Sequence, residues 1–194
     1  MNWGELKNLI LFPFRVICDH EKVTSLGLMS LRDERFGICF KYCKGKVLDV
    51  GCGEGNRFIK KYKNGIGIDR YAWEGIDMVC DAEEMPFAQE TFNTVLFIGS
   101  INHVLDRRKA IKEAYRVLKK EGRILITMIN PIIGFARHKL AWWDKDQCVR
   151  GMRRGESWGL WSSEIIKMLH EANFISIRRV PFLYGLNNLL IAEK

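Results

Sequence analysis

Three glycines at alternate positions, Gly51, Gly53 and Gly55, follow an apolar segment at 47–50 and precede a segment with helical spacing. A turn of this composition lets the backbone approach a bound ligand closely, because no Cβ stands in the way. The pattern therefore predicts a strand, a ligand-binding turn and a helix in succession. A dinucleotide fingerprint would require glycine or alanine at position 56, where Asn56 stands, so hydride transfer is disfavoured.

Two acidic residues end the next two apolar segments. Asp69 closes the segment 66–69, and Asp81 follows the segment 78–80. Carboxylates at the ends of neighbouring strands can accept the hydroxyl hydrogens of a ribose, so the combination predicts a nucleoside-sized groove. Taken singly, each residue is also a common turn residue.

One histidine stands where a general base could act. His103 lies just past the fourth predicted strand, 93–98. An imidazole near neutral pH can take a proton from a hydroxyl or amine. The same position is equally compatible with a histidine that caps or packs at the start of a helix.

The elements that must position these residues alternate between strand and helix patterns, which implies a mostly parallel sheet covered by helices. The short connection 181–188 can only join antiparallel neighbours, so an antiparallel seventh strand is expected to close the sheet. The fold class is therefore α/β, a Rossmann-like three-layer αβα sandwich with seven strands. The predicted strands are 46–50, 66–69, 78–80, 93–98, 123–128, 174–180 and 189–192.

Two segments fall outside this alternation, and the second is too long for a simple connection in a compact domain. It carries four of the six tryptophans, of which Trp142 and Trp143 are predicted to contact a substrate. We expect a single domain with four parts: an N-terminal cap (1–30), a cofactor-binding core (31–129), an acceptor-side insertion (130–161) and a last helix with the closing strands (162–194).

Length and composition limit the class of protein. A chain of 194 residues fits one domain, and 31 Lys and Arg against 23 Asp and Glu give a net charge of +8. Such a surface attracts anions and permits nucleic acid binding without requiring it. Six cysteines in a domain of this size, with no secretory signal before them, are expected to be reduced thiols in the cytoplasm.

Several of these segments together resemble the class I S-adenosylmethionine-dependent methyltransferases, specifically the type 11 branch that acts on small molecules. The resemblance covers about residues 31–194 and rests on 47–55, 67–69, 80–87, 93–104 and 118–126. Two departures stand out. The family's Leu-Lys-Pro-Gly-Gly turn is Leu-Lys-Lys-Glu-Gly at 118–122, and the second helix is shortened to a loop at 70–75.

The resemblance implies roles for individual residues. In the family the glycine turn holds the methionine and adenosine portion, so Gly51, Gly53 and Gly55 inherit that role. Asp69 would bind the ribose, Asp81 with Ala82 would read the adenine, and Asp49 would support the methionine amine. The neighbouring Cys52, Arg70 and Gly99 complete the predicted cofactor site. The implied cofactor is S-adenosylmethionine, with S-adenosylhomocysteine as product and no metal.

The expected function is methylation of a small-molecule or lipid-like acceptor, with His103 as the candidate base. RNA methylation is the alternative enzyme class, supported by the +8 charge and by cations interleaved with tryptophans at 137–154. A non-catalytic partner protein that binds the cofactor is the third possibility.

Overall fold

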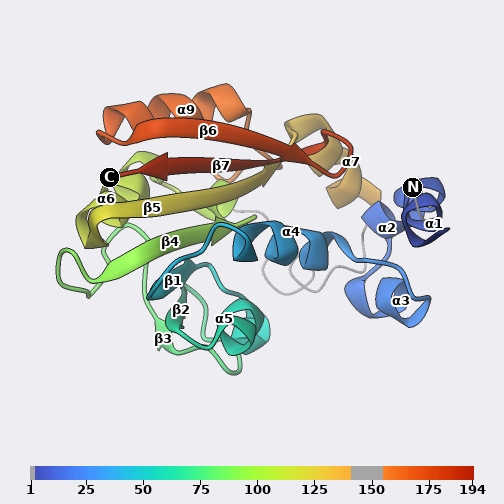
Figure 1. Cartoon of the computed structure of the whole chain (residues 1–194), viewed down its shortest axis with the longest axis horizontal. Coiled ribbons are helices and arrows are strands. Elements are labelled where there is room, and N and C mark those ends of the chain that lie inside the picture. Colours follow the sequence, from blue (N-terminus) through green and yellow to red (C-terminus); the bar gives the residue numbers. More distant parts are fainter. Residues whose placement is uncertain (1–2, 141–154) are drawn as a thin grey trace.

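A computed structural model describes residues 3–140 and 155–194 of the chain. Seven strands form one sheet in the order β3-β2-β1-β4-β5-β7-β6 (Figure 1). The first five run parallel to one another, and β7 is antiparallel to both of its neighbours. The strands are β1 (Val47–Val50), β2 (Gly65–Asp69), β3 (Met78–Val79), β4 (Phe92–Ile98), β5 (Leu118–Ile129), β6 (Ile175–Phe182) and β7 (Asn187–Glu193).

The predicted α/β fold with a mostly parallel sheet and an antiparallel last strand is confirmed. The expectation that the last strand closes the sheet is wrong, because β7 lies between β5 and β6 and leaves β6 at the edge. Burial explains the order. Residues 189–192 of β7 are all almost fully buried, whereas β6 exposes Arg178 and Arg179, which suit an edge strand.

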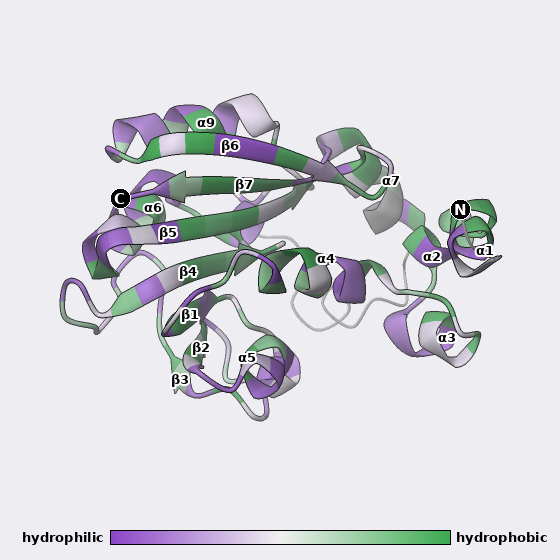
Figure 2. Ribbon diagram, in the orientation of Figure 1, coloured by the Kyte–Doolittle hydropathy of each residue, from purple (hydrophilic) through white to green (hydrophobic). Residues whose placement is uncertain are grey.

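Side chains of the central strands alternate between two apolar layers, as the two-residue period of a strand requires. Leu48 and Ile124 face one layer, while Val47 and Leu125 face the other. Helices α6 and α9 cover the first layer, and α4 and α5 cover the second, which gives the three-layer sandwich. In Figure 2 the hydrophobic colour runs along β4, β5 and β7, while polar residues colour the middle of β6.

The helices vary in length and are short at the N-terminal end. No helix within 3–140 and 155–194 is long and apolar enough to cross a membrane. The helices are α1 (Trp3–Ile10), α2 (Phe12–Ile17), α3 (His20–Ser25), α4 (Leu31–Phe40), α5 (Arg57–Tyr62), α6 (Arg107–Val117), α7 (Pro131–Leu140) and α9 (Ser162–Glu171), with 3₁₀ turns η1 (Glu54–Asn56) and η2 (Ile101–His103).

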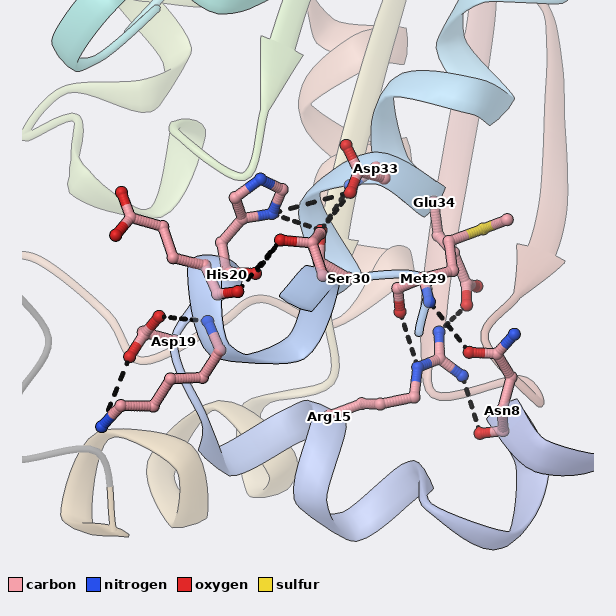
Figure 3. A network of polar contacts seen from close by, with 11 residues as sticks. Asn8, Arg15, Asp19, His20, Met29, Ser30, Asp33 and Glu34 are labelled. Atoms are coloured by element: carbon pink, nitrogen blue, oxygen red, sulfur yellow. Dashed lines mark hydrogen bonds and ion pairs between the residues drawn. The ribbon is translucent and has the colours of Figure 1, made fainter. Parts of the chain in front are cut away.

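The first three helices lie with α7 at the end of the molecule toward which the parallel strands point (Figure 1). An arginine of α2 joins the first two of these helices to α4. Arg15 of α2 is almost fully buried, and its guanidinium donates to the carbonyl oxygens of Met29 (2.7 Å) and Asn8 (2.8 Å). It also forms an ion pair with Glu34 of α4 (Figure 3). This network holds the N-terminal helices over the carboxyl edge of the sheet.

Candidate functional site

A pocket of about 660 Å³ opens at the carboxyl ends of the parallel strands, between them and the N-terminal helices. Gly55, although predicted to bind the cofactor, does not line the pocket, and Trp142 and Trp143 lie outside the described residues. The pocket brings together the other predicted site residues: Asp49, Gly51, Cys52, Gly53, Asp69, Arg70, Asp81, Ala82, Gly99 and His103.

The glycine turn after β1 uses conformations that favour glycine, with φ of +75° at Gly51 and +65° at Gly53. At Gly51 a Cβ would overlap the side chain of Ser100. At Gly53 a Cβ would meet no atom within 4 Å, so this position faces the open pocket. Gly55 does not line the pocket, and its N–H donates to the carbonyl of Glu74 (2.8 Å). The turn therefore presents Gly53 to a ligand and uses Gly55 to shape the backbone.

Asp69 at the end of β2 has both carboxylate oxygens held by the backbone. The Gly53 N–H donates to Oδ2 and the Tyr71 N–H donates to Oδ1, each at 3.0 Å. These bonds fix the orientation of the carboxylate and link the turn after β1 to the end of β2. Each oxygen keeps a further lone pair, so the group can also accept two hydroxyl hydrogens.

Asp81, after β3, forms a more exposed contact. The Arg70 guanidinium lies 3.4 Å from Oδ2, and the Glu83 N–H donates to Oδ1 (3.1 Å). Exposed ion pairs of this kind contribute little to stability. Arg70 and Asp81 line the pocket beside the buried Ala82, so a ligand could replace either member of this ion pair as a partner of the other.

Asp49, in β1, is the most unusual group in the pocket. It is 2% exposed, and its Oδ1 has no hydrogen-bond partner in the described part of the chain. Burial, reinforced by the negative charge of Asp69, raises the pKa of Asp49 to about 7. A carboxylate held without a partner in a pocket is suited to bind a cation. The same burial, together with the charge of Asp49, raises the pKa of Cys52, so its thiol stays protonated.

His103 is held at both ring nitrogens. Nδ1 lies 3.1 Å from the Glu156 carboxylate, which can only accept, so Nδ1 carries the proton. Nε2 accepts from the Asn102 side-chain amide (3.1 Å), whose other hydrogen is donated to the carbonyl of Ser157 (3.0 Å). The lone pair at Nε2 is thus the only position where His103 could take a proton. Glu156, 53 residues away in the sequence, gave no signal of this contact.

The turn also depends on Asn56, which sequence reasoning treated only as a missing glycine. Asn56 adopts a left-handed conformation (φ +46°), which asparagine tolerates. Its side chain donates to Asp77 (2.6 Å) and fills the space beside Gly67, where a Cβ would overlap it. The Gly67 N–H donates to the same Asp77 oxygen (2.7 Å). This contact fastens the turn to β2.

Both segments outside the strand and helix alternation reach the pocket. Val16 and His20 line it from the N-terminal side, and Gly134 and Trp158 line it from the segment after β5. The site therefore has one side formed by strand ends and another formed by these two segments.

Comparison with known families agrees with this geometry. Residues 48–126, which contain most of β1, the glycine turn, Asp69, Asp81 and His103, match the family model of a methyltransferase domain. The predicted cofactor residues therefore lie in the part of the chain that is similar to methyltransferases. Over 63 residues the chain is 43% identical to the ubiquinone/menaquinone biosynthesis C-methyltransferase UbiE of Desulfotalea psychrophila. That alignment covers 32% of this chain and 26% of the relative, so the chain spans about a quarter of its length.

Solved structures match over a longer part of the chain. A methyltransferase from Thermotoga maritima, described as a possible histamine N-methyltransferase, has a TM-score of 0.65 at 19% identity, over 84% of this chain and 89% of that one. The 1,6-didemethyltoxoflavin-N1-methyltransferase of Burkholderia thailandensis, with S-adenosylhomocysteine bound, has a TM-score of 0.59 at 16% identity, over 100% and 91%. At these identities the two structures show the shared fold.

Replacing Asp49 with Asn removes a buried group whose pKa in the folded chain is raised to about 7. In the unfolded chain Asp49 ionises near its ordinary pKa of 3.8, so the folded state loses stability as pH rises from about 4 to 7. Asp49→Asn should therefore be more stable than the natural chain at pH 8, by up to about 4 kcal/mol. Urea unfolding at several pH values measures this, and a difference that is the same at pH 4 and pH 8 would contradict it.

Proposed function

We propose that this chain transfers a methyl group from S-adenosylmethionine to a small-molecule or lipid-like acceptor, and that the acceptor carbon belongs to a quinol-type ring. The observation that carries the proposal is Asp49, a buried carboxyl whose Oδ1 has no hydrogen-bond partner among the described residues and which lines the same pocket as the glycine turn and Asp69. Burying a negative charge of this kind costs free energy unless a cation neutralises it. The amine of a methionine moiety is such a cation.

Each part of the cofactor has candidate partners among the pocket residues. Asp49 would bind the amine, the backbone at Gly51 and Gly53 would lie against the sugar and methionine portions, and Asp69 would accept from the ribose hydroxyls. Asp81 and Ala82 would face the adenine. The cofactor, when bound, supplies a methyl group on a positively charged sulfur.

The chain's own contribution is positioning and proton transfer. In-line displacement gains most of its rate from holding the acceptor atom against the methyl group, which requires a pocket shared by both ligands. Val16 and Trp158 offer an apolar side for an aromatic acceptor. His103 would take the proton of the ring hydroxyl at Nε2 once the acceptor replaces Asn102 there, and Glu156 would stabilise the resulting imidazolium.

The relative named for ubiquinone and menaquinone biosynthesis supports a quinol as the acceptor class and carbon as the methylated atom. Deprotonation of a ring hydroxyl raises electron density at the adjacent ring carbon, so a base near the acceptor is chemically appropriate for this reaction.

Methyl transfer can be measured with labelled S-adenosylmethionine and reduced 1,4-naphthoquinone as the probe acceptor. We expect label on the ring carbon, and a rate at least about 100-fold lower in His103→Asn. The matched control is His170→Asn, which changes an exposed histidine of α9 outside the pocket and should keep full activity. Binding of S-adenosylhomocysteine without any transfer of label would indicate a non-catalytic binding protein instead.

A side chain at position 53 should block the cofactor. In Gly53→Val the branched side chain would project into the pocket and be strained by the positive φ, so binding of S-adenosylhomocysteine in calorimetry should be abolished. Gly185→Val is the matched control, because Gly185 also has positive φ (+81°) and open space but lies outside this pocket. Near-normal affinity in Gly53→Val would show that the turn does not contact the cofactor.

A further inference from the structure

One wall of the pocket is basic and was not part of the predicted cofactor site. His20 at the start of α3, Arg32 in the first turn of α4 and Arg57 at the start of α5 all line the pocket. We call these three residues the basic wall. They come from the N-terminal ends of three helices and line the same pocket as the glycine turn.

The two arginines of the basic wall differ from the paired arginines elsewhere. Five arginines outside the basic wall form ion pairs with a carboxylate: Arg15 with Glu34, Arg70 with Asp81, Arg108 with Glu171, Arg116 with Glu113 and Arg123 with Glu193. Within residues 3–140 and 155–194, no such ion pair forms at Arg32 or Arg57.

The charges of the basic wall act against one another. The pKa of Arg32 is lowered by burial and then by the positive charge of Arg57, which outweigh the opposite effects of Asp33 and Glu21. Two guanidinium groups that repel each other in a partly buried wall leave a positive potential facing the pocket. An oxyanion placed between them would relieve the repulsion and accept several of their N–H groups.

His20 is held so that it can add to this potential. Ser30 has one hydroxyl hydrogen, which it donates to the Asp33 carboxylate (2.7 Å), so His20 Nδ1 must be the donor in its 2.6 Å contact with Ser30. The other ring nitrogen points away from Ser30 (Figure 3). Burial first, and then the charge of Arg32, lower the pKa of His20; Arg57 acts in the same direction, and Asp33 and Glu21 oppose it. A bound anion would reverse the balance and protonate the ring.

The carboxylate of the cofactor has a different cation available. In a methionine moiety the carboxylate shares one carbon with the amine, so it must lie close to the amine at Asp49. Gly99 lines the pocket with Asp49, and a Cβ built on Gly99 would lie 2.8 Å from Nη1 of Arg35. We therefore assign Arg35, which also lines the pocket, to the cofactor carboxylate, and Arg32 and Arg57 to another anion.

We propose that His20, Arg32 and Arg57 bind an oxyanion, a carboxylate or a phosphate group, carried by the methyl acceptor. The proposal rests on the proposed function for the identity of that acceptor, whereas the anion site itself can be tested without methyl transfer. It predicts that acceptors bearing an acidic group bind more tightly than their neutral counterparts.

The test is a titration of the full chain, with and without saturating S-adenosylhomocysteine, using benzoate and inorganic phosphate as separate probes. Nuclear magnetic resonance follows the Arg32 and Arg57 Nε–H groups and the His20 ring. We expect saturable binding of at least one probe in both states and a raised His20 pKa. Arg32→Gln and Arg57→Gln should each weaken binding about tenfold or more, and Arg32→Lys should weaken it less. Arg179→Gln, a matched change on exposed β6, should have no effect.

Three results would overturn the proposal. The first is that neither probe shows saturable binding, and the second is that both glutamine variants bind the probe with unchanged affinity. The third is that S-adenosylhomocysteine displaces the probe and binds more weakly to Arg32→Gln. This third result would assign the basic wall to the cofactor. A preference for phosphate over benzoate would identify a phosphorylated acceptor, and the reverse an aromatic acid. Anion binding in a chain that fails to bind S-adenosylhomocysteine would contradict the proposed function and leave the anion site intact.

Discussion

The pocket depends on a carboxyl group that the sheet buries, with one oxygen that has no hydrogen-bond partner among the described residues. Asp49 lies in β1, an interior strand of the sheet, and is flanked by Leu48 and Val50, which face the opposite apolar layer. Its position in the register is therefore set by the core, and its side chain cannot turn away to solvent. Burial raises its pKa to about 7, so near neutral pH the folded chain carries a partly ionised carboxyl group. A bound cation would neutralise its negative charge. The buried charge of Asp49 lowers the stability of the folded chain and favours the binding of a cation.

Clusters of opposite charge line different parts of the pocket. The strand ends contribute Asp49, Asp69 and Asp81, which suit a ligand with an amine and hydroxyl groups. The N-terminal side contributes His20 of the basic wall, which contacts Ser30 and Asp33. Arg15 fixes α1 and α2 against α4 through its bonds to Asn8 and Met29 and its ion pair with Glu34. A cationic methyl donor and an anionic acceptor would thus be drawn to different sides of one pocket.

The residues near the strand ends could be predicted because their signals are local. An apolar run that meets alternate glycines, and a second run that stops at Asp69, follow from strand geometry and the common edge of a parallel sheet. The position of β7 inside the sheet was missed because two antiparallel strands joined by a short turn can be placed in either order. Only the greater burial of β7 decides the order.

Contacts between distant segments gave no local signal. His103 contacts Glu156, which lies 53 residues later in the sequence, and Asn56 donates to Asp77, which lies 21 residues later. The three residues of the basic wall lie on separate helices and line one pocket only in the folded chain, so no local spacing in the sequence predicts them. Trp142 and Trp143 lie outside the described residues, and their contact with a substrate stays a prediction.

The most direct measurement of the role of Asp49 is the affinity of S-adenosylhomocysteine as a function of pH, followed by calorimetry between about pH 5.5 and pH 7.5. Below pH 7 the cationic amine must displace the Asp49 proton, so affinity should rise as pH increases and level off above the pKa. Asp49→Asn should bind weakly and without this dependence. A flat profile for the natural chain, or full affinity in Asp49→Asn, would show that the buried carboxylate does not bind the cofactor.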